Sequence, residues 1–127
     1  MSVSGRRRLA SAIVVALMAG CSTPPIVPGV PKVVSQQAIA PYESHTECLD
    51  LAPGDRLDYR FATSVPVAFN IHYREGRAYV MPITRDGVTS DAGIFAPRIV
   101  ENYCLMWEAG ANAALLDYRI VLRRVPP

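Results

Sequence analysis

The sequence of 127 residues has few of the side chains on which most catalytic and metal sites depend. It contains only two histidines and three cysteines, with no C-x-x-C pair and no Gly-x-Ser-x-Gly motif. Nucleophilic catalysis needs a nucleophile beside a base, and zinc sites need clustered cysteine and histidine ligands. We therefore predict that the protein is not an enzyme and carries no metal or other cofactor.

One possible metal site deserves separate treatment because its residue types are present. His72, Cys104, Met81 and Met106 are the ligand types of a copper centre on a β-sandwich. Such a centre needs two histidines and a thiolate, with a histidine and a methionine shortly after the cysteine. No histidine follows Cys104, and Met106 follows it too closely. The spacing thus argues against copper of this kind.

Long apolar runs are also scarce. The first, residues 9–19, is largely apolar and would span roughly 16 Å as a helix, whereas a bilayer core needs about twenty residues. Arg6, Arg7 and Arg8 precede it, and Ala19-Gly20-Cys21 closes it. This arrangement resembles a bacterial lipoprotein signal with its lipobox. An ordinary secretory signal, with Cys21 left as a free thiol, is the alternative.

The resemblance implies that residues 1–20 are a signal peptide and that Cys21 carries palmitate-type acyl chains, which together anchor the mature protein permanently. Ser22 follows the cysteine, and the lack of aspartate there favours the outer membrane, with the protein facing the periplasm. Removing the three arginines leaves ten basic against eleven acidic residues, a net charge of about −1. This balance predicts no nucleic-acid partner.

The mature chain divides into a tether and one small domain. Residues 21–43 contain five prolines and almost no charge, which favours an extended spacer. Alternatively, its apolar residues pack on the domain as an extra edge strand: Ile26, Val27, Val30, Val33 and Val34. Residues 44–127 are expected to form the domain.

Apolar and polar residues alternate through the domain, as in Leu57, Tyr59 and Phe61, and turn sequences containing glycine separate these runs. No segment has the periodicity of a helix. The pattern predicts a small antiparallel β-sandwich of seven to eight strands. The expected strands are residues 46–51, 56–62, 66–73, 77–84, 93–96, 99–107 and 114–123.

Cys48 and Cys104 remain once Cys21 is acylated, and an even count in an oxidising compartment predicts a disulfide. Closing a loop of about 57 residues stabilises a chain by roughly 4 kcal/mol through the entropy of the unfolded state. A small domain needs such a cross-link.

Several of these residues resemble the GOLD domain of secretory-pathway cargo receptors over residues 46–124. The similar features are Cys48 before Leu51-x-x-Gly54-Asp55-x-Leu57, then Val67-x-Phe69-x-Ile71, then Tyr103-Cys104 continuing to Trp107. The resemblance implies a β-sandwich cross-linked by Cys48 and Cys104, used as an interaction module. Residues 107–112 depart from the family pattern in the loop before the last strand.

The sequence therefore predicts a lipid-anchored binding or structural accessory module of the envelope, whose partner protein or ligand is unknown. Tyr79, Tyr103 and Trp107 are candidates for an exposed partner patch, or else they pack in the core. The alternative function is that of an inhibitor or a small-ligand binder. Residues 90–95 resemble the inhibitory loop of small envelope lipoproteins that block lysozymes.

The lipoprotein hypothesis predicts that Cys21→Ser releases the protein from the membrane fraction or leaves it unprocessed, because no thiol remains to be acylated. Fractionation of cells and mass spectrometry of the mature N-terminus measure both effects. Normal processing with unchanged partition into detergent would refute lipidation at Cys21.

Overall fold

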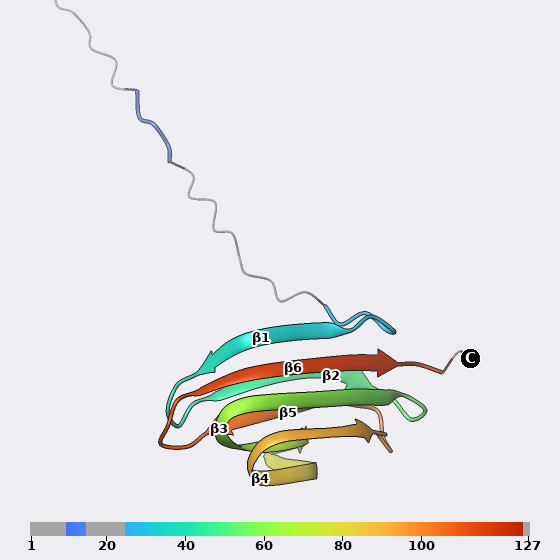
Figure 1. Ribbon diagram of the computed structural model, residues 1–127. Coiled ribbons are helices and arrows are strands. Elements are labelled where there is room, and N and C mark those ends of the chain that lie inside the picture. The colour runs from blue at the N-terminus through green and yellow to red at the C-terminus, as the bar shows by residue number, and fades with distance from the viewer. Residues whose placement is uncertain (1–9, 15–24, 126–127) are drawn as a thin grey trace, which may run out of the picture.

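The computed structural model describes residues 10–14 and 25–125, in which all regular structure is β-strand. The predicted all-β fold is confirmed, and the described residues include no helix long and apolar enough to cross a membrane. Cys21 and the predicted cleavage site lie outside the described residues. Six strands follow one another (Figure 1): β1 (Lys32–Ile39), β2 (Ser44–Leu51), β3 (Arg56–Glu75), β4 (Ala78–Phe95), β5 (Glu101–Ala109) and β6 (Ala114–Arg123).

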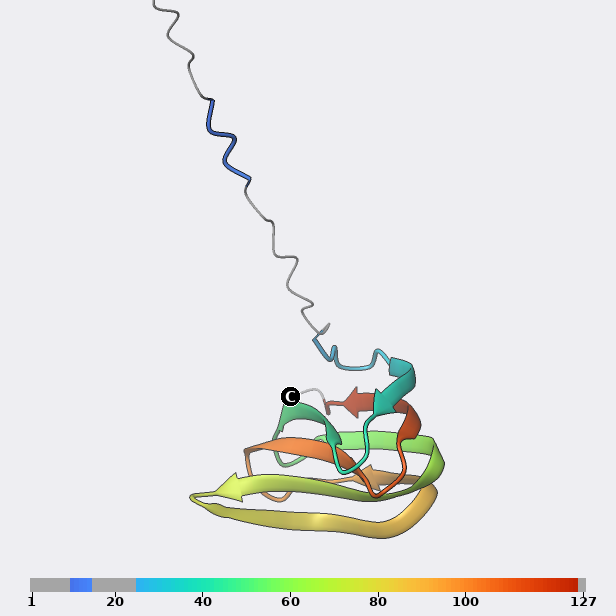
Figure 2. The same ribbon diagram turned by 90° about the vertical axis from the view of Figure 1, so that its left-hand side faces the viewer.

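All strand pairs are antiparallel and belong to one sheet, in the order β1-β6-β3-β5-β2. Strand β3 is long enough to have two successive neighbours on one side. Its first part, residues 56–63, pairs with β6, and residues 67–72 pair with β5. Strand β4 pairs with β3 along the other side. The sheet curls, as Figures 1 and 2 show, so that its β6 half faces its β5 half.

The curl arises where β3 and β4 bend together. The β3–β4 register shifts between Ala62 and Val67, and Pro66, which has no N–H to donate, lies in this stretch. Opposite it, Gly87 adopts a φ of 64°, which glycine tolerates best. The predicted strands 56–62 and 66–73 are therefore one bent strand. Likewise, the predicted strands 77–84 and 93–96 are both part of β4. These two mergers and the additional strand β1 account for six strands in place of the predicted seven to eight.

The predicted tether contributes one strand that the sequence did not assign to the domain, namely β1. Residues 32–39 form β1 and pair with β6, while Gly29 donates a backbone hydrogen bond to the carbonyl of Leu122 at 2.7 Å. Ile26 and Val34 pack against the core. The edge-strand alternative therefore describes this segment better than a spacer does, because apolar residues between the prolines find a partner on the sheet. Most of the predicted tether belongs to the folded unit.

The core between the two halves of the sheet is aromatic. Trp107 on β5 is fully buried and stacks on Tyr118 of β6, with 4.7 Å between the ring centroids. Phe69 lies 5.5 Å from the same indole. The stacking of Trp107 on Tyr118 joins the two halves of the sheet and stabilises the curl.

Of the two alternatives for the candidate patch, packing in the core holds for two of the three residues. Tyr103 and Trp107 are 1% and 0% exposed, and only Tyr79 is exposed. Residues of β5 alternate as expected, but Cys104 and Met106 face outward rather than inward, since the disulfide joins two adjacent strands on the outer surface of the sheet. The aromatic residues consequently face the core.

Truncation of Trp107 to alanine should lower the free energy of unfolding by about 3 to 5 kcal/mol and the melting temperature by more than roughly 10 °C. Leu115→Ala is the matched control, because Leu115 is about half exposed on β6. Calorimetry of both variants measures the difference. Equal, small shifts for the two would contradict a buried indole.

Candidate functional site

A chain of hydrogen bonds closes the sheet between its edge strands β1 and β2. Lys32 and Glu47 form an ion pair with 2.6 Å between Nζ and Oε1. Tyr118 donates its hydroxyl proton to the other Glu47 oxygen at 2.9 Å, and His45 Nε2 lies 3.1 Å from the same hydroxyl. We call these four residues the Glu47 cluster. They bond to one another across the sandwich and hold β1 against β2.

Burial governs ionisation in the Glu47 cluster. Removal from water, followed by the hydrogen bond to Glu47, holds the pKa of Tyr118 above its usual value. Burial lowers the pKa of His45, an effect that the charge of Glu47 opposes and that of Lys32 reinforces. The imidazole is therefore neutral at pH 7, and the cluster contains one charge pair supported by two neutral hydrogen-bonding groups.

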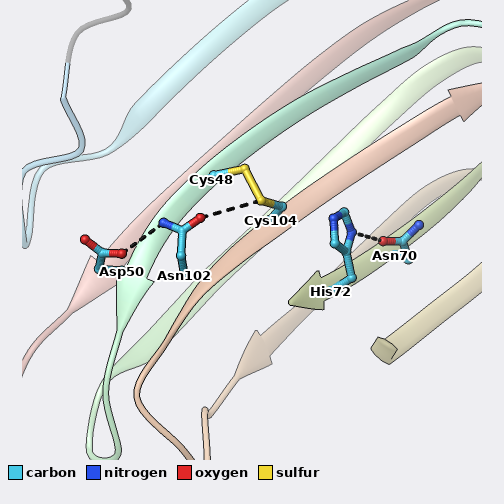
Figure 3. Close-up of a disulfide and its surroundings, with 6 residues drawn as sticks. All are labelled: Cys48, Asp50, Asn70, His72, Asn102 and Cys104. Atoms are coloured by element: carbon cyan, nitrogen blue, oxygen red, sulfur yellow. Dashed lines mark hydrogen bonds between the residues drawn. A yellow bond between two sulfur atoms is a disulfide. The ribbon is translucent and has the colours of Figure 1, made fainter. Parts of the chain in front are cut away.

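The outer face of β2 and β5 carries the predicted disulfide, which is confirmed. Cys48 and Cys104 are directly opposite each other on the two strands and are bonded (Figure 3). Asn102 donates to Asp50 at 2.9 Å beside it. The side-chain oxygen of Asn102 also lies 3.9 Å from the Cys104 sulfur. Because a disulfide sulfur carries no proton, that approach is a contact and not a hydrogen bond.

On the β4 side of the curled sheet, residues from the two ends of β4 line one hollow. This β4 groove has a volume of about 640 Å³. Strand β4 contributes apolar side chains from both of its ends, and the aromatic rings of Tyr73 and Tyr103 also line it. Its principal apolar lining residues are Tyr73, Val80, Ile83, Ile94, Phe95 and Ile99.

The floor of the β4 groove is rigid. Tyr103 packs edge to face against both Phe95 and Tyr73, with ring centroids 5.1 and 5.3 Å apart. Its hydroxyl donates to the carbonyl of Ile99 at 2.9 Å, which fixes the loop after β4. Thus the predicted patch residue Tyr103 does border a surface feature, although as a buried wall of a groove.

The rim of the β4 groove is apolar and solvent-exposed. Among its lining residues, Ile94 is 68% exposed and Ile99 is about half exposed, and Val100 beside Ile99 in the chain is 72% exposed. Arg98 is the one charged residue that lines the groove. Strand β4 pairs only with β3 among the described strands, so the backbone groups along its other side have no strand partner. An apolar groove beside an unpaired strand edge is a typical binding surface for a polypeptide.

The structure bears differently on the remaining residues that the sequence singled out. Cys21 lies outside the described residues. Residues 90–95, expected as an inhibitory loop, belong to β4 and pair with β3, so they form no protruding loop. The described residues contain no cluster of three or more histidine, cysteine, aspartate or glutamate side chains able to hold a metal ion. The sequence analysis missed the β4 groove, whose only local signal is the apolar series Ile94, Ile99 and Val100 around Pro97.

No protein-family model matches the sequence, and no curated protein is significantly similar to it. The functional argument therefore depends on the geometry of this chain.

Both histidines should make stability depend on pH. Burial lowers the pKa of His45 and of His72 below the ordinary value of 6.5. As the pH falls below about 6.5, the unfolded state takes up protons that the folded state does not, so the free energy of unfolding should decrease. The stabilisation is present above this value and is lost progressively below it.

Urea unfolding at about pH 7.5 and about pH 5.5 measures this loss, in a range where ordinary carboxylates stay ionised. The double variant His45→Gln, His72→Gln should show a much smaller difference between the two conditions. If wild type and double variant lose stability equally, groups other than the histidines control the pH dependence.

Proposed function

We propose that the protein is a lipid-anchored binding module of the bacterial cell envelope that has no catalytic activity of its own. The observation that carries the proposal is the β4 groove, which combines exposed apolar side chains with an unpaired strand edge. The charged groups of the Glu47 cluster bond to one another and are enclosed, so they offer no reactive group to a substrate. Binding is the activity that this geometry supports best.

The occupant we propose is an extended segment of a partner protein with alternating apolar side chains and an acidic residue. A strand added along β4 would satisfy its free N–H and C=O groups, while alternate side chains of the partner would enter the groove. Arg98 makes no ion pair with another described residue and stands at the groove. Charge complementarity therefore favours a carboxylate on the partner near Arg98.

The position of β1 supports the proposed anchor geometry. If Cys21 is acylated, only residues 22–25 separate it from Ile26, which packs on the core. Four extended residues reach about 14 Å at most, so the domain would stand close to the bilayer. Such a module binds partners at or near the membrane surface rather than far from it.

The alternative of a lysozyme-type inhibitor loses its main support, since residues 90–95 are part of a paired strand. A small apolar ligand with an acidic group remains an outcome to test, because the β4 groove has a volume within the usual range for ligand sites. Such a ligand would use the groove without pairing with the β4 backbone.

A photo-crosslinking amino acid at Ile94 should form an adduct with a partner protein in intact envelopes, whereas the same residue at Leu115 on β6 should not. The two positions are both exposed but lie on different surfaces. Equal adducts at both positions, or adducts at Leu115 alone, would contradict a partner site at the β4 groove.

Charge reversal then tests the recognition. Arg98→Glu should weaken binding of the purified partner by about tenfold or more, and exchange of the partner's acidic residue for lysine should restore it. Amide NMR of the complex should show new protection along β4. If only the NMR signals of groove side chains shift and the β4 amides stay unprotected, the partner occupies the groove without pairing with the β4 backbone.

A further inference from the structure

On the outer face of β3, one ring nitrogen of His72 is held by a hydrogen bond and the other has no partner among the described residues. His72 is 7% exposed, and its Nδ1 lies 2.7 Å from the side-chain oxygen of Asn70, itself 8% exposed (Figure 3). Because an amide oxygen only accepts, Nδ1 carries the proton and Nε2 keeps a free lone pair. Burial lowers the pKa of His72, which keeps the ring neutral.

The Nε2 atom of His72 has no hydrogen-bond partner within residues 25–125, yet it is not among the fully enclosed unpartnered atoms of that region. Solvent or a solute therefore reaches it. A hydrogen bond that orients a histidine through one nitrogen and leaves the other free is the arrangement found in metal sites, where such outer partners fix the tautomer.

Thioether side chains occupy strand positions on both sides of His72. On β5, Met106 is opposite Asn70, which places it diagonally next to His72, and Cys104 is directly opposite. On β4, Ile83 is opposite Ile71 and Val80 is opposite Tyr73, so the register shift between them leaves Met81 and Pro82 together opposite His72. Apart from Met1 and Met18 in the predicted signal, these are the only methionines of the sequence.

The imidazole and the two thioethers determine which metal ion suits this position. A neutral imidazole with two thioethers is a soft set that suits monovalent copper, whereas zinc prefers thiolate and histidine, and calcium or magnesium need carboxylates. Cys48 and Cys104 are bonded to each other and supply no thiolate. Arg74 lies over the nearby ring of Tyr79, which packs against His72, and its positive charge further disfavours divalent ions.

We propose that His72, Met81 and Met106 form a surface site for a soft monovalent metal ion, Cu(I) or Ag(I), with Asn70 as the positioning residue for the imidazole. This site differs from the copper centre that the sequence argued against, because it needs neither a second histidine nor a cysteine. It is separate from the β4 groove and does not depend on the function proposed for it.

Silver nitrate is the probe of choice, since Ag(I) is a soft monovalent ion like Cu(I) and needs no reductant to stay monovalent. The mature chain in detergent should bind one Ag(I) by isothermal titration calorimetry. In NMR spectra the methyl signals of Met81 and Met106 should both shift. The variants Met81→Leu and Met106→Leu, which conserve volume, should each weaken binding by about tenfold or more.

His45→Gln is the matched control and should leave Ag(I) binding unchanged, whereas His72→Gln should abolish it. Asn70→Ala should weaken Ag(I) binding about tenfold while the disulfide and the fold, followed by circular dichroism, persist. Binding that survives both methionine substitutions, or a chain that binds no Ag(I), would overturn the proposal. Equal competition by Zn(II) would also overturn it, because it would show a site that does not depend on soft ligands.

Discussion

The bend in β3 is the constraint on which the rest of the structure depends. One strand of 20 residues pairs with β6 through its first part and with β5 through its second, so the angle between these parts decides how the two halves of the sheet face each other. Pro66 removes a backbone donor at the bend, and Thr63 supplies a side-chain hydrogen bond to the carbonyl of Val65 at 2.7 Å. Trp107 and Tyr118 stack only because this bend brings their strands together.

Period-two alternation was sufficient to predict an all-β chain and most strand positions, because one face of each strand is buried and the other is wet. It did not predict strand continuity. A bend within a strand and a turn between strands use the same residues, as Pro66 and Gly87 show. For Lys32–Ile39 the sequence offered an edge strand only as the alternative to a spacer, since the segment is rich in polar residues and its pairing with β6 is a long-range contact.

The site was harder to predict than the fold, and the disulfide illustrates why. The disulfide was predicted from the even number of remaining cysteines and the expected oxidising compartment alone. That pairing does not determine which face of β5 carries Cys104. Once Cys104 faces outward, alternation buries Tyr103 and Trp107, which decides between the two alternatives that the sequence left open for them. The β4 groove depends on the two ends of β4 meeting across the curl, a juxtaposition that no local pattern contains.

The curled sheet has two edge regions, one closed by side-chain contacts between β1 and β2 and one open along β4. At one edge the Glu47 cluster joins β1 to β2, and β1 is the strand nearest in sequence to the proposed anchor. At the other, the side of β4 turned away from β3 has no strand partner among the described residues, and the apolar groove is exposed; β1 and β4 lie on opposite sides of the molecule in Figure 1. An ion pair at 2.6 Å between nearly buried groups closes the first edge, whereas the second exposes Ile94, Ile99 and Val100 to solvent. If the proposed anchor holds the domain at a membrane through β1, the β4 groove lies on the opposite side of the domain from β1, where a partner can reach it.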